Sequence, residues 1–400
     1  MKLTYVITTR NRRDALLRTL DHLQRATPLA EHAWEVLVVD NGSADGTGDA
    51  LARRRDVKVI SLAENEGVPA RNLAIARARG KFVALLDDDT RPTDQTIERA
   101  LNYLSRHPRC GAVTGRVLLA TNQSDAPALP AVLMGGASIV RKTLLDEVGG
   151  FAAEFFRQEA EYDLSLRIWR AGFRIDRFED LCFERESRPI EPPSPLSLRM
   201  DLRNNLILAE RYLPRPIRRE YRRDWIRRYA LLSRSDARGR GANAALKEAR
   251  VWARREMAVG RKPLPSDAVE SVFHLAAQRR AVAPWARSCG ARRVCIADWG
   301  KNLYATWSAC RSAGLCVEAI LENANPLSGA DYRGIPVLRD TQCAPLRFDA
   351  VVLSTLNAAT APARAIELRE RLRVPVLELW SPTLLDPPLP APVPPIEEAA

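Results

Sequence analysis

Three consecutive carboxylates, Asp87, Asp88 and Asp89, directly follow an apolar run at residues 82–86. The run predicts a buried strand, so the acids are expected at the point where that strand ends. Mg²⁺ and Mn²⁺ prefer carboxylate oxygens and keep open positions for phosphate oxygens. The triplet therefore predicts a divalent cation that holds a diphosphate; the alternative is a solvated acid cluster at a strand end.

The elements that must position these acids alternate along the first hundred residues. Predicted strands cover residues 3–8, 35–40, 57–61 and 82–86, and predicted helices cover 14–25, 44–55 and 68–78. This alternation predicts a parallel sheet covered by helices on both faces, whose ligands bind beyond the carboxyl ends of the strands. Polar residues follow three of these ends and outline one nucleotide-sized cleft: residues 8–11, 40–43 and 87–89.

Composition and charge narrow the class of protein. The chain has 400 residues, of which 46% are hydrophobic, which is enough for two or three domains with their own cores. No apolar stretch approaches the ~20 residues that span a bilayer, and the N-terminus begins in a strand rather than a signal peptide. Seven cysteines without a Cys-x-x-Cys pair indicate reduced thiols. We therefore expect a cytoplasmic protein.

The pattern divides the chain into four segments. Residues 1–213 form the first α/β domain, 214–284 a helical basic extension with a flexible stretch at 239–241, and 386–400 a proline-rich tail. Residues 285–385 predict a smaller α/β domain, with strands at 293–297, 316–321, 335–338, 350–354 and 376–379 and helices at 303–313 and 361–372. A dinucleotide site would need Gly-x-Gly-x-x-Gly after its first strand, but only Gly300 is present and Trp299 would crowd a pyrophosphate.

Several ordered motifs in residues 1–213 resemble the family-2 glycosyltransferases, inverting enzymes with a nucleotide-sugar-binding α/β fold of the GT-A type. They are the stretches at 8–12, 36–43, 65–72, 87–89, 135–142 and 155–167. A later Arg203-Asn204-Asn205 resembles a segment of bacterial rhamnosyltransferase-like members, where it approaches the diphosphate or only caps a helix. The second domain looks like Rossmann-like sensing domains of sugar-modifying enzymes, with a structural or docking role equally open.

The resemblance implies roles for individual residues. Asp40 would bond the nucleobase, and Asp87 and Asp89 would hold Mg²⁺ or Mn²⁺. The full set implied to bind the nucleotide sugar is Thr8, Thr9, Arg10, Asp40, Asn41, Gly67, Arg71, Asp87 and Asp88. The acceptor side would comprise Gly136, Ala137, Glu159 and Asp163, with small residues that let a sugar ring approach the backbone.

The general base departs from the family's pattern. Aligning the chain on Asp163 places Glu161 at the position of the base, where the family usually has an Asp, and this makes Glu159 a competitor. Acids also favour a helix's first turn through its dipole, which is a purely structural reading of the same residues. Many relatives supply a His after the last strand; here there is none, so the metal rests on the Asp triplet alone or Glu184 substitutes.

The basic segment has two readings. Residues 199–262 carry 19 Lys or Arg against 7 Asp or Glu, and an aromatic stripe recurs every four residues at Ile217, Tyr221, Trp225 and Tyr229. Such a helix over residues 217–229 can lie on an anionic membrane surface, or its stripe can pack on the protein and leave a solvated basic face. Nucleic acid is disfavoured, because the sequence carries no recognisable binding module.

The leading hypothesis is a metal-dependent inverting glycosyltransferase that moves a sugar from a nucleotide-diphosphate donor to a glycan or lipid-linked acceptor. With a lipid-linked acceptor it would work at the inner face of the membrane. The alternative is a catalytically weak nucleotide-sugar-binding scaffold that acts through its C-terminal domain. Donor sugar, nucleobase and acceptor depend on loop shape.

Overall fold

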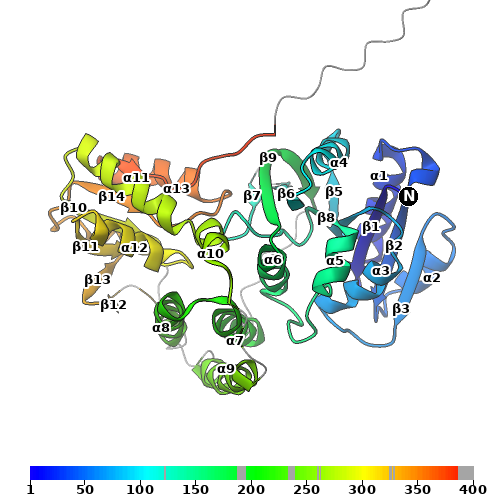
Figure 1. Ribbon diagram of the computed structural model, residues 1–400, viewed down its shortest axis with the longest axis horizontal. Helices are drawn as coiled ribbons and strands as arrows, with labels where there is room; N and C mark the ends of the chain where they lie inside the picture. Colours follow the sequence, from blue (N-terminus) through cyan, green and yellow to red (C-terminus); the bar gives the residue numbers. More distant parts are fainter. Residues whose placement is uncertain are drawn as a thin grey trace, which may run out of the picture.

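Two α/β units are joined by a group of helices in the computed structural model (Figure 1). The structure describes residues 1–120, 123–186, 195–232, 239–258, 261, 263–323, 327 and 329–385. The predicted proline-rich tail at 386–400 lies outside these residues.

The N-terminal unit is built on a mixed sheet of order β3-β2-β1-β4-β8-β6-β9-β5, with β7 paired to β6. Strands β1 to β4 are parallel to one another, whereas β8 runs antiparallel to both β4 and β6. The strands are β1 (Leu3–Thr9), β2 (Trp34–Asn41), β3 (Lys58–Leu62), β4 (Phe82–Asp87), β5 (Thr90–Pro92), β6 (Cys110–Leu119), β7 (Ser124–Asp125), β8 (Ser138–Arg141) and β9 (Arg174–Arg185).

Helices cover both faces of this sheet because its central strands are apolar on both sides. Tyr5 and Ile7 of β1 pack in one core with α1 and α4, while Val6 packs in the other with α3, α5 and α6. Continuous apolar runs of this kind are typical of strands buried on both faces. The helices are α1 (Arg13–Ala26), α2 (Thr47–Ala52), α3 (Arg71–Arg77), α4 (Thr96–Arg106), α5 (Lys142–Val148) and α6 (Ala160–Arg170).

The predicted elements of the first hundred residues are confirmed in order and type. The main difference is α2, which begins at Thr47 rather than near residue 44. Gly46 adopts φ 82 before it, and the Asp45 carboxylate accepts hydrogen bonds from the backbone and hydroxyl of Thr47. The turn therefore takes up the residues that the pattern had assigned to the helix.

The connecting helices are α7 (Pro195–Tyr212), α8 (Arg215–Leu232), α9 (Gly239–Ala258), α10 (Ser266–Phe273) and α11 (Leu275–Ser288). Two predictions about this region were wrong. Gly239 begins α9 instead of lying in a flexible stretch, and Pro284, taken as a domain boundary, lies inside α11. Helix α9 packs against α7, and α11 packs against α12 (Leu303–Ser312).

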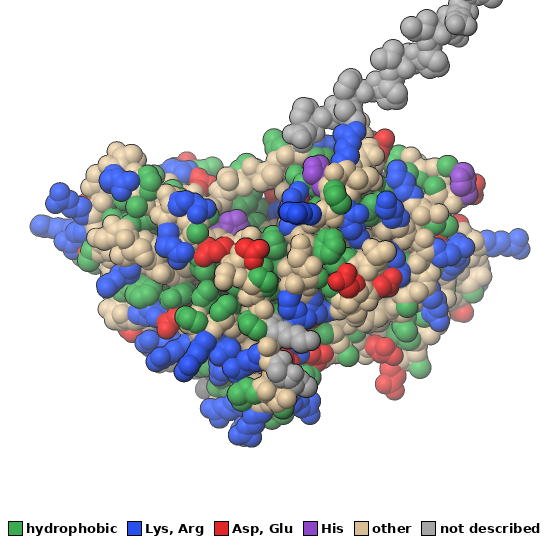
Figure 2. Space-filling view, in the orientation of Figure 1, with side chains coloured by type: hydrophobic (Ala, Val, Ile, Leu, Met, Phe, Trp, Pro, Cys, Tyr) green, Lys and Arg blue, Asp and Glu red, His purple; other side chains and the backbone are tan. Residues whose placement is uncertain are grey.

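The aromatic stripe of α8 packs inside the protein. Tyr221, Trp225 and Tyr229 are buried, and the Tyr221 ring contacts Phe273 of α10 at a centroid distance of 5.0 Å. Of the two readings of this stripe, packing on the protein is therefore the one found for these three side chains. Lys and Arg side chains still gather on the outside of α8 and α9 (Figure 2). None of the helices in the described part of the chain is both long and apolar enough to cross a membrane.

The C-terminal unit has a sheet of order β12-β13-β11-β10-β14-β15, parallel except for β12. Its strands are β10 (Arg293–Ala297), β11 (Cys316–Leu321), β12 (Asp331–Tyr332), β13 (Ile335–Leu338), β14 (Ala350–Leu353) and β15 (Val376–Leu377), with helices α12 and α13 (Ala361–Leu372). The predicted strands and helices of this unit are confirmed within two residues at their ends. The segment after β15 returns to β9, where the backbone N–H of Glu179 donates to the carbonyl of Thr383 at 3.0 Å (Figure 1).

Candidate functional site

The parallel register places the predicted polar strand ends side by side. Thr8 of β1 is paired with Asp87 of β4, and Thr9 is paired with Asp40 of β2. Thr9 also donates from its hydroxyl to Asp88 at 2.9 Å. Because the strands run in the same direction, three segments far apart in the sequence meet at one edge of the sheet, as the alternation predicted.

A cleft of ≈ 380 Å³ opens at this edge. Six residues predicted to bind a nucleotide sugar line it: Thr8, Thr9, Arg10, Asn41, Gly67 and Arg71. Four further lining residues were missed as contacts: Asn65, Val68, Phe156 and Arg157. All four lie within the motifs at 65–72 and 155–167, but no local pattern indicates that Phe156 and Arg157 approach the loop at Asn65.

Gly67 is required where these two loops meet. Its backbone has φ 70, and a Cβ there would lie 2.1 Å from the carbonyl oxygen of Phe156. Asn41 holds the same loop, since its side chain accepts a hydrogen bond from the Glu66 N–H at 2.8 Å and donates to the Gly67 carbonyl at 3.1 Å. Only a residue without a side chain can occupy this backbone position, so Gly67 shapes one wall of the cleft.

Asp40 lies behind the cleft rather than on its surface. Its side chain is buried and accepts a hydrogen bond from the backbone N–H of Ser43 at 3.1 Å. The structure thus brings Asp40 to the predicted edge but uses one of its oxygens to fix the turn after β2.

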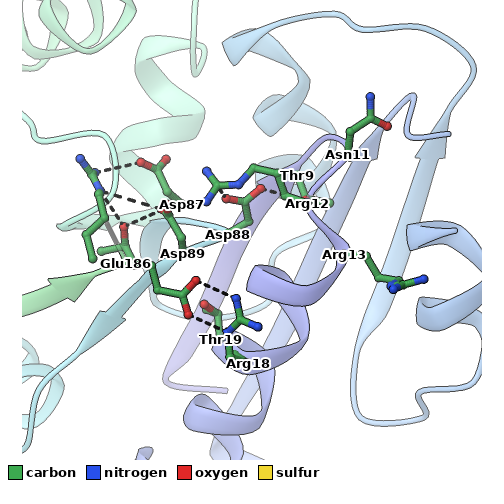
Figure 3. Close-up of polar contacts among 12 residues, drawn as sticks. Thr9, Asn11, Arg12, Arg13, Arg18, Thr19, Asp87, Asp88, Asp89 and Glu186 are labelled. Carbon is green, nitrogen blue, oxygen red and sulfur yellow. Dashed lines mark hydrogen bonds and ion pairs between the residues drawn. The ribbon is translucent and has the colours of Figure 1, made fainter. Parts of the chain in front are cut away.

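The acid triplet is paired with arginines. Arg12 lies 2.7 Å from Asp89 and 3.3 Å from Asp88 (Figure 3). Burial raises the pKa of Asp88 to about 6, with the Arg12 charge and the Thr9 hydroxyl opposing the rise. The Asp89 side chain is fully enclosed.

Asp87 is the more accessible acid and faces two guanidinium groups. Its two oxygens accept hydrogen bonds from Arg71 at 2.6 Å and from Arg185 at 3.0 Å. Arg185 belongs to β9, next to Glu184, which the sequence offered as a substitute metal ligand. Glu184 is exposed, so the side chain that β9 brings to the acids is a cation.

Glu161 lies on the other side of Arg71, in the first turn of α6. Its carboxylate is 3.6 Å from Nη1 of Arg71, and its side chain is 22% exposed. Burial raises the pKa of Glu161, Arg71 lowers it, and the charges of Asp87 and Glu159 raise it further. The arrangement gives a carboxylate that is more basic than an ordinary Glu and remains reachable.

The two glycines before β8 make room for side chains rather than for a ligand. A Cβ at Gly135 would lie 2.6 Å from the Glu161 carboxylate, and one at Gly136 would lie 2.9 Å from both Asp87 and Arg185. Ala137 is buried in the core. The prediction that Gly136 and Ala137 let a sugar approach the backbone is therefore corrected, because neighbouring side chains fill that space.

The other two acids of the α6 segment are engaged inside the protein. Asp163 is fully buried and accepts hydrogen bonds from Arg167, Arg211 and Tyr212, the last at 2.6 Å. Glu159 pairs with Lys301 at 2.7 Å. Asp163 therefore cannot face an acceptor, and Glu161 is the acid of this segment left near Arg71.

The acids can be tested for their fit to the predicted cation. Carboxylate oxygens are suitable donors, and Mg²⁺ is commonly held by one or two carboxylates together with substrate phosphates. Asp87, with a side chain 25% exposed, fits that role, whereas Asp89 would have to release Arg12. Among the residues that the structure describes, no group of three or more His, Cys, Asp or Glu side chains forms a protein-only metal site.

Comparison with known sequences relates the N-terminal part of the chain to glycosyltransferases. Residues 4–127 match the model of glycosyl transferase family 2. The putative teichuronic acid biosynthesis glycosyltransferase TuaG of Bacillus subtilis is 36% identical over 92 residues, which are 22% of this chain and 36% of that protein. The pre-mycofactocin glycosyltransferase of Mycobacterium tuberculosis is 28% identical over 204 residues, covering 45% of this chain and 41% of that protein. The chain thus spans less than half of either relative.

Among solved structures, the fold is similar to that of Staphylococcus aureus TarS. A crystal structure of TarS has a TM-score of 0.51 at 17% identity and covers 83% of this chain and 56% of that one. The structure of TarS residues 1–349 in complex with UDP-GlcNAc has a TM-score of 0.50 at 17% identity. It covers 78% of this chain and 91% of that one. At this identity the likeness concerns the fold, which is of the GT-A type.

Proposed function

We propose that this protein, whose residues 4–127 match glycosyl transferase family 2, transfers a sugar from a nucleotide-diphosphate donor to a hydroxyl group of a glycan or lipid-linked acceptor. A cell-envelope glycan is the proposed acceptor class, in keeping with the named role of TuaG in teichuronic acid biosynthesis. The proposal includes inversion at the anomeric carbon.

The observation that carries this proposal is the cleft at the carboxyl edge of the sheet. Six residues expected from the sequence line it, and the Asp87, Arg71 and Glu161 side chains follow one another beside it. The neutral and cationic lining suits a nucleoside diphosphate, because guanidinium and backbone N–H groups are strong partners for phosphate oxygens. Asp88 is proposed as a contact of the nucleoside, whereas Asp40, which lies behind the cleft, is proposed to hold the turn after β2.

Glu161 is proposed as the general base. Its carboxylate would take the proton of the acceptor hydroxyl as the oxygen attacks C1 of the donor sugar, and the C1–O bond breaks with its electron pair leaving on the diphosphate. A raised pKa favours the proton's transfer to Glu161, while the Arg71 charge opposes the rise and favours the ionised form. A base so placed typically contributes ~10²–10⁴-fold to the rate.

Positive charge on the donor side has two proposed sources. Arg71 and Arg185 already face Asp87, and their guanidinium groups can stabilise charge that develops on the leaving diphosphate. Mg²⁺ or Mn²⁺, proposed to be held by Asp87 and Asp89 together with the phosphates, would add Lewis-acid stabilisation of the same charge. Binding of the ion would separate Asp89 from Arg12.

A thermal-shift screen of nucleoside diphosphates and nucleotide sugars, with and without Mn²⁺, tests the proposal first. A rise in the protein's melting temperature with one class of nucleotide would identify the donor class. Slow hydrolysis of that donor by the same sample would demonstrate turnover. Glu161→Gln should keep binding and lose turnover, whereas Glu147→Gln, an exposed acid on α5, should behave as the unmodified protein. Binding without any hydrolysis or transfer would favour the scaffold alternative instead.

A further inference from the structure

The loop that leads into the helix of Glu161 has an unusual backbone. Gln158 and Glu159, the two residues before α6, both have positive φ values, 47 and 64. Residues other than glycine rarely adopt this conformation, and two in succession persist only when the surroundings hold them. The position of Glu161 therefore depends on whatever fixes this loop.

One clamp comes from α7. The side-chain amide of Asn204 donates to the carbonyl oxygens of Arg157 at 2.9 Å and Gln158 at 2.8 Å. The Arg203-Asn204-Asn205 motif thus contacts the loop before α6 through Asn204, a contact that neither of the two readings of the motif had predicted.

The second clamp comes from the C-terminal domain. Nζ of Lys301 lies 2.7 Å from the Glu159 carboxylate and also bonds Asn205. The ammonium group lies over the rings of Tyr162 at 4.5 Å and Trp225 at 5.5 Å. The pair is largely enclosed, with 19% of the Lys301 side chain and 8% of the Glu159 side chain exposed. In such surroundings an ion pair is weakly screened, and loss of one partner leaves a costly unpaired charge.

Lys301 lies in the turn after the first strand of the C-terminal sheet. It follows β10, the first strand of the C-terminal sheet, where a dinucleotide-binding fold would have its glycine-rich turn. Here Trp299 is buried, and its carbonyl accepts a hydrogen bond from Arg228 of α8 at 2.9 Å. The turn is used for contacts with the rest of the chain.

Charge links the Lys301 pair to Glu161. The groups that bear on the Glu161 carboxyl are Arg71, which favours its ionisation, and Asp87 and Glu159, which oppose it. Glu159 in turn interacts with Lys301 and Asp201. Burial, and then the charge of Glu159, raise the pKa of Asp201 to about 6. Removing the ammonium group would leave the Glu159 charge uncompensated only two residues from Glu161.

We propose that Lys301 is a positioning residue through which the C-terminal domain holds Glu159, and with it the Glu161 carboxylate, in the geometry for sugar transfer. This inference rests on the proposed function of Glu161. In this role the C-terminal domain supports the reaction through the contact of Lys301 with Glu159, and the role does not require that domain to bind a ligand.

The test compares Lys301→Met with Lys301→Arg in the full chain, using nucleotide affinity, kcat and the pH dependence of kcat. For Lys301→Met we expect unchanged nucleotide affinity, a kcat lower by roughly 10²-fold, and an acid limb of the profile displaced to higher pH. Lys301→Arg, which keeps the charge, should recover most of kcat. Arg347→Met, which removes an exposed charge from the same domain, should change nothing.

A double variant separates positioning from misfolding. Lys301→Met combined with Glu159→Gln removes both charges, so the acid limb should return to its original pH while kcat stays low. A wild-type kcat and pH profile in Lys301→Met would overturn the inference, as would parallel losses of nucleotide affinity and thermal stability. A wild-type protein that binds nucleotide sugars but never turns them over would overturn the proposed function itself.

Discussion

Arg71 donates a hydrogen bond of 2.6 Å to Asp87. The same guanidinium lies 3.6 Å from Glu161, so one buried cation stands between the acid proposed for the donor side and the acid proposed for the acceptor side. Without it, two carboxylates would face one another in a partly enclosed space, which raises pKa values and favours protonation of one of them. Arg71 is thus the residue on which the separation of the two roles depends.

Replacing Arg71 by Met should therefore lower kcat/KM by roughly 10²-fold or more, because the proposed donor to the diphosphate and the partner of both acids are lost together. The free energy of unfolding should fall by about 2 kcal/mol, since Asp87 keeps Arg185. Steady-state kinetics and urea unfolding measure the two effects. Arg77→Met removes an exposed arginine from the same helix and is the matched control; equal behaviour of the two variants would refute the role of Arg71.

Gly67→Ala should close part of the cleft. The added methyl group would meet the Phe156 backbone at 2.1 Å, so either the loop at Asn65 or the one at Phe156 must move. We expect nucleotide affinity to fall at least about tenfold, a change of ~1.4 kcal/mol in binding free energy, as measured by calorimetry.

Gly172→Ala is the control for backbone strain alone. Gly172 has φ 85, but a Cβ there would meet nothing within 4 Å. This variant should lose roughly 1 kcal/mol of stability and keep its nucleotide affinity. If both variants bind nucleotide normally, the cleft beside Gly67 is not the donor site.

Mn²⁺ should strengthen binding of a nucleoside diphosphate, and chelation should reverse the effect, if Asp87 and Asp89 hold the ion together with the phosphates. Asp89→Ala should abolish the metal-dependent part of the affinity in calorimetric titrations. Asp94→Ala, an exposed acid close by in the sequence, should not. An affinity for nucleoside diphosphate that is equal with Mn²⁺ and with chelator would leave the arginines as the source of positive charge.

Stability should depend on pH through Asp298. Burial raises the pKa of Asp298 to about 6, with Arg364 opposing the rise. Since an Asp in an unfolded chain titrates near ~3.9, the folded state binds more protons between about pH 4 and 6. The stabilising contribution is therefore complete below about pH 4 and is lost as the pH rises through about 6, up to about 3 kcal/mol.

Asp298→Asn imitates the protonated carboxyl at every pH and suits the φ of 72 found there. Urea unfolding from pH 4 to 8 should show a flatter stability profile for this variant than for the unmodified protein. Glu370→Gln, an exposed acid of α13, should retain the original slope. A profile unchanged by Asp298→Asn would mean that Asp298 titrates as an exposed acid does.

The sequence by itself was sufficient for the strands and helices of the first ninety residues or so and of the C-terminal unit, and for the polar strand ends at Thr8, Asp40 and Asp87. Apolar runs and helical periodicity are local, and parallel strands must end at a common edge, so these features follow from short stretches of chain. The family resemblance added the expectation of a nucleotide-sugar cleft, and six of the residues it named line a cleft at the carboxyl edge of the sheet.

Only the tertiary structure decided which charges meet. Asp163 and Glu161 lie two residues apart and look alike in the sequence, yet one is enclosed by Arg167 and Arg211 while the other stays open beside Arg71. Lys301 reaches Glu159 across 142 positions of the chain. Ion pairs of this range depend on how whole domains pack, because the energy of a charge is set by neighbours in space that the local sequence does not contain.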